Sequence, residues 1–420
     1  MADEKCIVGL DIGTSVIRVA IGEVDDNGNL SVVATSSKPS AGLRNGVIVN
    51  IEDAKDAIKE AVEAAEQEGG VIVTSVIASV GGSQIESENS RGVTPIRPSG
   101  KNNTRTVTPE DVTKVIETAT AINYPADREK IHVIPQNYFV DNIENISNPV
   151  NMIGFKLEAE VHIVTASKTT IQNIRSCINR AGYELDGVML KTLAEVQSVC
   201  HEDEMDLGSI IIDLGAGTTD VIVLLKGAPI STASVQVGGN IVTNDIAIVT
   251  GIPVAAAEKI KIESGCCWLP GVEVDEDVIL PGVGGRAPEI IGKKDLCQII
   301  QARMEKTFTM VKAAIIKNTK ETIKELAGNI ILTGAGANME GVVELAQSVF
   351  KTSSVRIGIP ESLGGIEEQY RNPEFATAIG LIVANKGIVE KRENRRKSKK
   401  NTVKSKDKES VLKRLRRMFF

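Results

Sequence analysis

Strand-like apolar runs and amphipathic helical segments alternate along the chain, and this alternation predicts an α/β fold. Residues 6–21 and 209–225 each read as two β-branched strands joined by a short glycine-containing turn. The segment Thr108-Pro109-Glu110-Asp111 combines an N-cap residue, a proline and two acids, which is the pattern of a helix start. Helical segments are expected at residues 51–68, 112–122, 170–181, 294–317 and 373–385.

The end of the chain shows a different pattern, a basic stretch followed by a short amphipathic segment. Residues 391–409 contain one large apolar residue, Val403, and are expected to form a solvated, flexible linker. From Ser410 onward, a helix would place apolar side chains on one face and cations on the rest of its circumference. Such a short helix folds at an anionic lipid surface rather than alone in water, and docking on a partner protein is the alternative. The residues expected to bind the membrane are Val411, Leu412, Lys413, Arg414, Leu415, Arg416, Arg417, Met418 and Phe419.

Charge is distributed unevenly between this tail and the rest of the chain. The 420 residues, enough for two or three domains, carry a net charge of −7. Residues 391–417 contain 14 basic and three acidic residues, so the remainder has 34 basic and 52 acidic residues and a net charge of −18. Because a body this acidic repels polyanions, we expect no nucleic-acid partner.

The histidines, the cysteines and the lengths of the apolar runs argue against a zinc protein, a disulfide-linked protein and a membrane-spanning protein. Three histidines and six cysteines lack the spacing of a structural zinc site. The scattered cysteines do not suggest a disulfide framework, which fits a reducing compartment. No apolar run approaches the length of about 18 residues that a transmembrane helix needs, and the N-terminus does not resemble a signal peptide.

Two similar turns, 202 positions apart, carry the strongest chemical signal. Each follows an apolar strand that ends in Asp-x-Gly, and each precedes a second β-branched strand. Glycine lets the backbone approach a ligand and aim its amides at anionic oxygens, while a carboxylate can hold the water shell of Mg²⁺. Two such hairpins facing each other would clamp a triphosphate and its metal, with Asp11 and Asp213 reaching the metal through water. The residues are Asp11, Gly13, Thr14 and Ser15 in the first turn, and Asp213, Gly215, Gly217, Thr218 and Thr219 in the second.

A third glycine cluster, Thr333-Gly334-Ala335-Gly336-Ala-Asn338, also follows an apolar strand and precedes a helix. It lacks the spacing of a dinucleotide fingerprint, and the chain contains no P-loop motif. The cluster suits a loop that admits a flat base close to the backbone. An ordinary helix-entry turn is the alternative.

These three clusters resemble the phosphate 1, phosphate 2 and adenosine motifs of the actin, Hsp70 and sugar-kinase ATPase superfamily. Within it, further segments are similar to the bacterial cell-division family FtsA, over about residues 5–386 and the end of the tail. The resemblance implies an α/β, actin-like ATPase fold with two duplicated domains, central mixed sheets flanked by helices, and an inserted small α+β subdomain. The segments are His132-Val-Ile-Pro-Gln136, Asn148-Pro149-Val150, Gly238-Gly-Asn-Ile-Val-Thr-Asn-Asp-Ile-Ala247, Gly284-Gly-Arg286 and Val355-Arg-Ile-Gly358.

The same template divides the chain into domains, and prolines mark the loops of the inserted lobe. The first domain is expected at residues 1–82, 163–199 and 361–390, with the inserted subdomain at 83–162. The second domain is expected at residues 200–250 and 329–360, with an upper subdomain of its own at 251–328. The linker at 391–409 and the membrane helix at 410–420 complete the chain.

The resemblance implies further contacts at a site for ATP and Mg²⁺. Glu258 and Lys261 share one helix face and match residues that hold the ribose and base, although a surface ion pair is the alternative. Asn338 matches a position near the adenine. The turn formed by Gly238, Gly239 and Asn240 resembles one that lies near the phosphates, and Gly334, Ala335 and Gly336 belong to the adenosine motif.

Hydrolysis needs a residue that orients or deprotonates water near the γ-phosphate. In actin-like proteins this residue comes from the helix before the second hairpin, where this chain has Glu195 and Gln197. The resemblance therefore implies ATP binding with, at most, slow or regulatory hydrolysis.

The expected partners also follow from the resemblance. The C-terminal tail of the division protein FtsZ would bind the upper subdomain, where Arg303 is the best candidate beside Lys306 and Lys312. The chain would form an actin-like homopolymer, bind anionic membrane lipid and contact later divisome membrane proteins. It would lie on the cytoplasmic face of the bacterial cell membrane at the division septum. A small-molecule kinase of the same superfamily is the alternative, but a kinase has no use for a lipid-binding tail.

Overall fold

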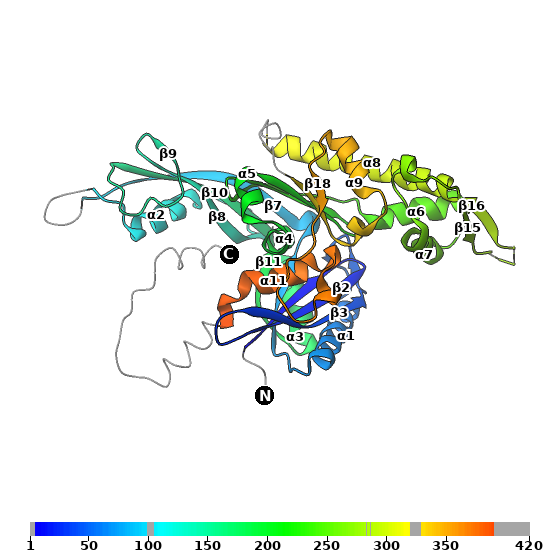
Figure 1. Cartoon of the computed structure of the whole chain (residues 1–420). Helices are drawn as coiled ribbons and strands as arrows, with labels where there is room; N and C mark the ends of the chain where they lie inside the picture. Colours follow the sequence, from blue (N-terminus) through cyan, green and yellow to red (C-terminus); the bar gives the residue numbers. More distant parts are fainter. Residues whose placement is uncertain (1–4, 99–104, 283, 286, 320–328, 390–420) are drawn as a thin grey trace.

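The computed structural model describes residues 5–98, 105–282, 284–285, 287–319 and 329–389 (Figure 1). The expected linker and membrane helix, at residues 391–420, lie outside these described residues, as does Arg286. The described chain contains two five-stranded sheets, a four-stranded sheet and two two-stranded sheets, with helices packed against them.

The first five-stranded sheet has the order β11-β6-β1-β2-β3. Strands β1 and β2 form an antiparallel hairpin, β3 continues it, and β6 and β11 run parallel on the other side. Helices α1 and α3 pack on one face of this sheet, and α4 and α11 pack on the other. The elements are β1 (Cys6–Ile12), β2 (Val16–Val24), β3 (Leu30–Pro39), β6 (Ser75–Val80), β11 (Glu184–Leu190), α1 (Ile51–Gly69), α3 (Lys168–Ala181), α4 (Lys191–Val199) and α11 (Ala376–Asn385). The short pair β4 (Leu43–Arg44) and β5 (Val47–Ile48) lies between β3 and α1 in sequence.

The second five-stranded sheet repeats this plan with the order β14-β13-β12-β17-β18. Again a central hairpin is extended by one antiparallel strand on one side and two parallel strands on the other. Helices α6, α8 and α9 contribute to a buried cluster on one face. The elements are β12 (Ser209–Leu214), β13 (Thr219–Leu225), β14 (Ala228–Val235), β17 (Ile330–Thr333), β18 (Val355–Ile357), α5 (Glu202–Leu207), α6 (Gly239–Thr250), α7 (Val254–Ser264), α8 (Lys293–Thr319) and α9 (Val342–Phe350). The short helix α10 (Glu367–Tyr370) packs on β3 of the first sheet.

The two halves match residue by residue at their central hairpins. Asp11 lies opposite Arg18 in the first hairpin, and Asp213 lies opposite Asp220 in the second. Both members of the second pair stand 202 positions after their counterparts in the first. The duplicated, actin-like α/β arrangement that the resemblance implies is therefore confirmed.

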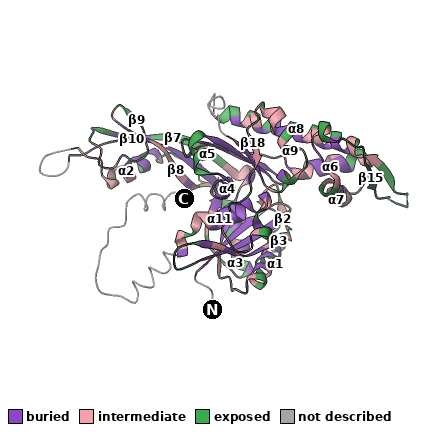
Figure 2. Ribbon diagram, viewed as in Figure 1, coloured by how far each residue is buried: buried purple, intermediate pink, exposed green. Residues whose placement is uncertain are grey.

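The two domains share one buried core rather than meeting at their surfaces. Ile211, Ile222 and Ile331 of the second sheet belong to the same cluster as residues of α4 and α11. Figure 2 shows this junction, near the labels α4 and α11, as a concentration of buried residues. A shared core fixes the relation of the two hairpins because shifting one domain would expose apolar surface to water.

An inserted lobe, seen at the upper left in Figure 1, consists of one helix and a four-stranded sheet in the order β7-β10-β8-β9. The lobe also reaches the second domain, because Asn89 Nδ2 and Gln136 Nε2 each donate a hydrogen bond of 2.8 Å to a carbonyl of β14. The lobe therefore contacts both halves of the molecule. Its elements are β7 (Ile85–Pro95), α2 (Pro109–Ala119), β8 (Arg128–Val140), β9 (Ile143–Ile146) and β10 (Lys156–Ser167).

The helices follow the predictions with differences at their ends. Helix α2 begins as predicted, with a capping box in which Thr108 and Asp111 satisfy each other's backbone amides. It ends at Ala119, so the prediction of a helix to residue 122 is wrong; Thr120 caps it and its hydroxyl bonds to the carbonyl of Glu117. The segment predicted to begin at Pro373 opens with a 3₁₀ turn and becomes α11 only at Ala376.

The second domain carries an upper subdomain, at the right in Figure 1, that contains α7, part of α8 and the hairpin β15 (Asp277–Leu280) and β16 (Glu289–Gly292). Within the described residues, no single helix is long and apolar enough to cross a membrane. The consecutive helices α6 and α7 are long and apolar enough only when they are taken together. The chain bends by 109° at the break between them.

Candidate functional site

The turns of the two central hairpins face each other across one cleft of about 470 Å³ between the domains. Small-molecule sites in proteins usually measure about 300–1,000 Å³. Every residue expected to bind nucleotide lines this cleft except Asn240, whose Oδ1 accepts a hydrogen bond from Ser15 Oγ at 3.3 Å. The lining residues among those expected are Asp11, Gly13, Thr14, Ser15, Asp213, Gly215, Gly217, Thr218, Thr219, Gly238, Gly239, Glu258, Lys261, Gly334, Ala335, Gly336 and Asn338.

The two hairpins come close enough to touch. A Cβ atom added to Gly217 would lie 2.7 Å from Thr14 Oγ1 and 3.0 Å from Asn45 Cα. Thr14 Oγ1 is itself held in place because it accepts the Gly46 N–H at 2.9 Å. Glycine at position 217 is therefore required by this close approach between the domains, in addition to any requirement of the turn.

The two carboxylates that precede the turns have different surroundings. Asp11 Oδ1 accepts a hydrogen bond of 2.8 Å from Ser79 Oγ, which in turn accepts the Ile12 N–H. Asp213 is fully buried, and neither of its carboxylate oxygens has a hydrogen-bond donor. Burial raises the pKa of Asp213, and the neighbouring ammonium of Lys191 opposes this shift. An undonated, buried carboxylate oxygen fits a position that a metal-bound water occupies.

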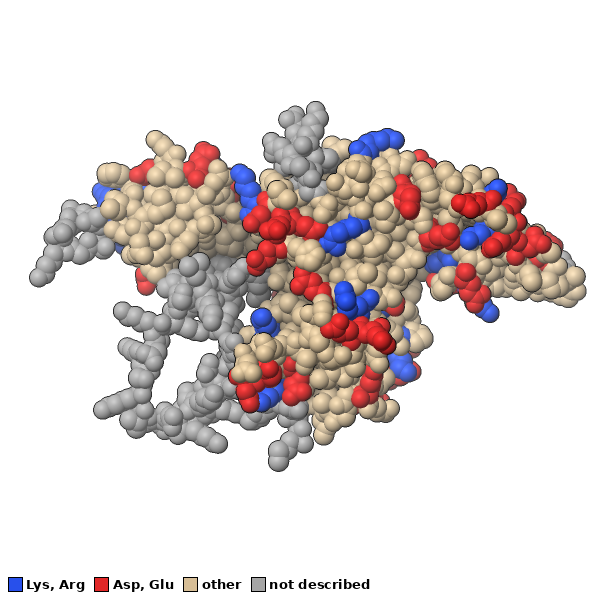
Figure 3. Space-filling model, in the orientation of Figure 1, with Lys and Arg blue, Asp and Glu red and all other residues tan. Residues whose placement is uncertain are grey.

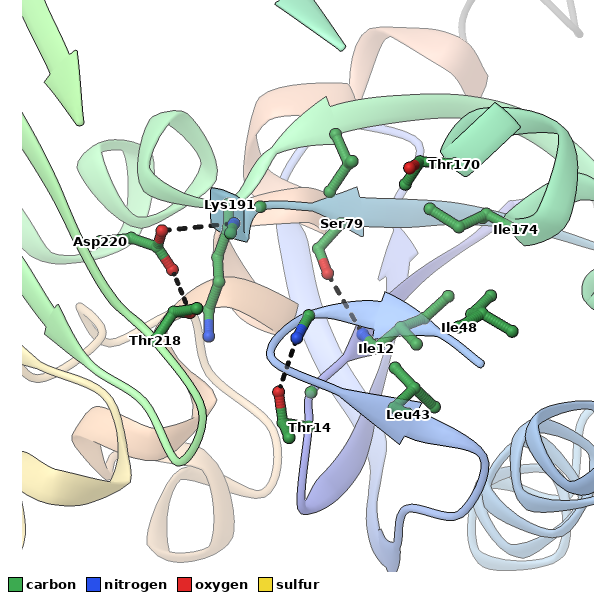
Figure 4. A pocket seen from close by; sticks show the side chains of 15 residues that line it. Ile12, Thr14, Leu43, Ile48, Ser79, Thr170, Ile174, Lys191, Thr218 and Asp220 are labelled. Atoms are coloured by element: carbon green, nitrogen blue, oxygen red, sulfur yellow. Dashed lines mark hydrogen bonds between the residues drawn. The ribbon is translucent and has the colours of Figure 1, made fainter. Parts of the chain in front are cut away.

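Lys191 is a cleft residue that the sequence did not reveal. Its ammonium lies 2.7 Å from Asp213 Oδ2, although the angles are not those of a hydrogen bond. Burial alone would lower the pKa of Lys191, but the carboxylates led by Asp213 and Asp11 outweigh it and hold the pKa well above its usual value. Figure 4 shows this side chain reaching down between Thr218 and Ser79 towards Thr14.

The position of Lys191 depends on the inserted lobe. The N–H of Leu190, at the junction of β11 and α4, donates a hydrogen bond of 2.9 Å to Nε2 of His132 on β8. Burial lowers the pKa of His132 to about 4, so the ring is neutral at neutral pH and Nε2 is free to accept. This hydrogen bond helps fix the start of α4 and thereby the place from which Lys191 projects.

Another part of the cleft wall contains the residues expected to hold ribose and base. Lys261 Nζ lies 2.7 Å from Glu258 Oε2 and 2.9 Å from Thr243 Oγ1, so the expected pair forms part of the cleft wall. Gly334 adopts a φ of +79°, and an added Cβ would lie 2.0 Å from Asp213 Oδ1. The third glycine cluster thus packs directly behind the carboxylate of the second hairpin.

Comparison with known proteins gives the family of the chain. A family model for "Cell division protein FtsA" matches residues 210–380, and a model for the SHS2 domain inserted in FtsA matches residues 82–165. The cell division protein FtsA of Borreliella burgdorferi is 43% identical over 378 residues, which cover 90% of each chain. The chain belongs to the FtsA family. The Escherichia coli FtsA is 35% identical over 385 residues, again 90% of each chain. This membership supports an actin-like role in cell division and does not favour the small-molecule kinase.

Solved structures with low sequence identity share the fold. The PilM–PilN type IV pilus biogenesis complex aligns with a TM-score of 0.63 at 16% identity and covers 90% of this chain and 98% of its own. MreB5 of Spiroplasma citri, bound to ADP, aligns with a TM-score of 0.55 at 16% identity and covers 93% of this chain and 99% of its own. At such low identity these likenesses show the actin-like fold alone.

The residues expected to orient water in this FtsA-family chain do not line the cleft. Glu195 is fully buried behind the wall, where its Oε1 accepts a hydrogen bond of 2.8 Å from Thr377, a lining residue. Burial, reinforced by the charge of Asp213, raises the pKa of Glu195 well above its usual value. Gln197, two residues further along α4, does not reach the cleft because the helix turns it away from the face of Lys191 and Glu195.

Arg303, the residue expected to bind the FtsZ tail, is held in an ion pair within the protein. Its guanidinium forms a two-pronged ion pair with Asp245 on α6, at 2.5 and 3.0 Å, and this hydrogen bonding raises its pKa. Lys312 is likewise engaged, donating to the carbonyl of Val349 at 2.9 Å, whereas Lys306 is exposed. Figure 3 shows acidic side chains gathered over this subdomain, at the right of the view.

Other lining residues were not anticipated and come from distant parts of the chain. Arg18 and Glu374 both line the cleft and form an ion pair with each other. The segment around Glu374 also reaches the second domain, because Gly334 N–H donates to the carbonyl of Pro373 and Asn338 donates to Asn372. Pairing of Arg18 with a residue 356 positions away leaves no local sequence signal.

Proposed function

We propose that the chain binds ATP with Mg²⁺ in this cleft and acts as an actin-like cell-division protein, with at most slow hydrolysis. The supporting observation is that both Asp-x-Gly hairpins and the third glycine cluster line one cleft. The first and second turns would aim backbone amides at the phosphates, and Glu258, Lys261 and Asn338 would hold the nucleoside. MreB5 of Spiroplasma citri, which has the same fold, has been solved bound to ADP and to AMPPNP, which supports this choice of ligand.

Asp11 and Asp213 would hold the metal through its water shell. Within the described residues there is no group of three or more His, Cys, Asp or Glu side chains that could hold a metal by itself. The undonated oxygens of Asp213 fit an outer-sphere role instead. When bound, Mg²⁺ would neutralise phosphate charge.

Substitution of Asp213 tests this part of the proposal. Asp213→Ala should weaken ATP binding in Mg²⁺ by at least about tenfold, or about 1.4 kcal/mol. Asp56→Ala, which removes an exposed carboxylate from α1, is the control and should bind ATP as the wild type does. Equal ATP affinity of the three proteins in equilibrium dialysis would contradict a role for Asp213.

The cellular part of the proposal is that the protein polymerises on the cytoplasmic face of the cell membrane at the division septum and anchors FtsZ there. It would also contact later divisome membrane proteins through the inserted lobe. Its support is the family membership together with the amphipathic pattern of residues 410–420. Deletion of residues 410–420 should abolish co-sedimentation with anionic liposomes in the presence of ATP.

One reconstitution tests lipid, filament and partner together. On a lipid monolayer with ATP, the full chain should form filaments and recruit a peptide with the sequence of the FtsZ C-terminal tail. The truncated chain should bind the peptide in solution but should leave the monolayer bare. Equal sedimentation of both proteins with liposomes would contradict the membrane role of the tail.

A further inference from the structure

Lys191 supplies a positive charge at the point where the two phosphate hairpins meet. Its side chain is 18% exposed, and its ammonium lies against the fully buried carboxylate of Asp213. It lines both the main cleft and a smaller adjoining pocket of about 40 Å³, whose walls include Thr14, Thr218 and Asp220 (Figure 4). A ligand phosphate held between the turns would therefore lie beside this ammonium.

The helix that carries Lys191 does not explain its presence. Lys191 is the first residue of α4, and the residue before it provides no side-chain cap. A helix N-terminus carries partial positive charge, so a cation there is disfavoured. The compensating charges belong to other elements, since Asp11 lies in β1, Asp213 lies in β12 and Asp220 lies in β13.

Of these three carboxylates, only that of Asp213 has no hydrogen-bond donor on either oxygen. Asp220 accepts the Gly82 N–H at 3.3 Å and the Thr218 hydroxyl at 2.9 Å. Asp11 has its Ser79 donor, whereas Asp213 has no donor on either oxygen and has Lys191 beside Oδ2. The ammonium of Lys191 therefore lies beside Oδ2, while the glycine cluster at Gly334 packs behind Oδ1.

We propose that Lys191 is a built-in counter-cation for the nucleotide triphosphate, sharing with Mg²⁺ the task of neutralising charge between the two hairpins. This inference rests on the proposed ATP site. An ammonium has three donors, so Lys191 can stay beside Asp213 and still donate to phosphate oxygens. Without it, the three aspartates would repel the triphosphate unless a divalent cation intervened. The protein should accordingly keep much of its affinity for ATP when Mg²⁺ is absent.

A purely structural role for Lys191 predicts a different result. If the ion pair with Asp213 only stabilised the fold, its loss would lower the free energy of unfolding and would leave the Mg²⁺ dependence of nucleotide binding unchanged. The ratio of the ATP dissociation constant in EDTA to that in Mg²⁺ separates the two roles. Stability does not enter this ratio as long as the protein is folded.

The experiment measures ATP binding to the full chain by equilibrium dialysis, in excess Mg²⁺ and in EDTA. For the wild type, the dissociation constant in EDTA should lie within about tenfold of that in Mg²⁺. Lys191→Gln should raise the ratio by at least about another tenfold, and Lys191→Arg, which keeps the charge, should restore most of the wild-type ratio. Lys59→Gln, which removes an exposed cation from α1, is the matched control and should leave the ratio unchanged.

The outcomes distinguish this inference from the proposal on which it rests. No ATP binding by the wild type in either buffer would overturn both. Binding in Mg²⁺ that falls by more than about a hundredfold in EDTA, or an equal ratio in wild type and Lys191→Gln, would overturn the counter-cation alone. If Lys191→Gln does not fold, the ratio of the two ATP dissociation constants of the wild type alone still tests the counter-cation role. A thermal melt of each variant establishes that it is folded.

Discussion

At the scale of single residues, burial decides how the ionisable groups around the cleft behave. Glu195 lies in α4 and His132 contacts the start of this helix, and burial raises the pKa of Glu195 and lowers that of His132. Asp213 is also buried, and the partly exposed Lys191 lies beside it, so the two compensate each other's charge. The start of α4 thus brings together a histidine, a lysine and a glutamic acid whose pKa values are all shifted by their surroundings.

His132 and His162 should make the protein less stable in mild acid. Burial lowers the pKa of each to about 4, whereas an unfolded histidine has a pKa of about 6.5. Below pH 6.5 the unfolded chain therefore binds more protons than the folded one, and stability falls as the pH drops towards 4. The loss is about 1.4 kcal/mol per pH unit for each histidine.

His132→Gln isolates one of these contributions. The glutamine amide oxygen can still accept the Leu190 N–H but does not titrate. Between pH 7 and pH 5, the variant should lose about 2 kcal/mol less of its free energy of unfolding than the wild type loses. Urea denaturation at the two pH values measures this difference. An identical pH dependence in both proteins would show that His132 does not titrate on unfolding.

At the scale of elements, helix ends are determined by short-range chemistry that the sequence displays. Helix α2 begins at a capping box in which Thr108 Oγ1 accepts the Asp111 N–H and Asp111 accepts the Thr108 N–H. Helix α1 likewise begins with Asn50, whose side chain accepts two backbone amides, and is followed by Gly70 in the left-handed conformation. These signals are contained within four residues of the helix end.

Thr108→Ala should therefore destabilise the inserted lobe by about 1 kcal/mol, because the Asp111 N–H at the start of α2 loses its side-chain acceptor. Ser167→Ala is the matched control, since Ser167 precedes α3 without a side-chain capping bond and its loss should have little effect. Hydrogen exchange of amides in α2 measures the local effect. Equal protection in the two variants would argue against the capping box.

The pairing of α6 with α8 bears on the proposed FtsZ site. Because Asp245 holds Arg303 in an ion pair, an acidic peptide has to compete with that carboxylate. Asp245→Asn should tighten binding of an FtsZ tail peptide by at least about threefold, corresponding to an ion pair of about 0.7 kcal/mol. Asp295→Asn is the control, because it also removes one negative charge, from α8, and leaves the ion pair between Asp245 and Arg303 intact. The same gain in both variants, measured by fluorescence anisotropy, would exclude a specific role for Arg303.

At the scale of the whole molecule, the cleft depends on how closely the two duplicated domains approach. The contact between Gly217 and Thr14 has no room for even one added methyl group. The segment Asn372–Glu374 reinforces the junction, because it pairs with Arg18 in the first domain and with Gly334 and Asn338 near the base of the second. The cleft thus takes its shape only when both domains and this segment are packed together.

Gly217→Ala tests this dependence. The added Cβ should push the hairpins apart and weaken ATP binding by at least about tenfold, while each domain stays folded. Gly187→Ala is the matched control because a Cβ at that position in β11 meets nothing within 4 Å. Unchanged ATP affinity of Gly217→Ala in equilibrium dialysis would mean that the hairpins can separate without loss of binding.

Much of the fold and most of the candidate site could be predicted from the sequence. The hairpins at Asp11 and Asp213, their spacing of 202 residues and the third glycine cluster were all visible, and the structure lines one cleft with them. Glu195 and Gln197, which were predicted to orient water, do not line the cleft, whereas Lys191 of the same helix does. Helical periodicity indicates which residues share a face, but it does not indicate which face meets the ligand.

The sequence alone determined what depends on neighbouring residues: strand and helix positions, turn chemistry, the duplication and the contrast between an acidic body and a basic tail. Only the tertiary structure decided which distant side chains meet, such as Lys191 with Asp213, Arg18 with Glu374 and Arg303 with Asp245. The physical reason is that hydrogen-bonded turns and helices form within a few residues, whereas burial and the pairing of charges arise from the packing of whole domains.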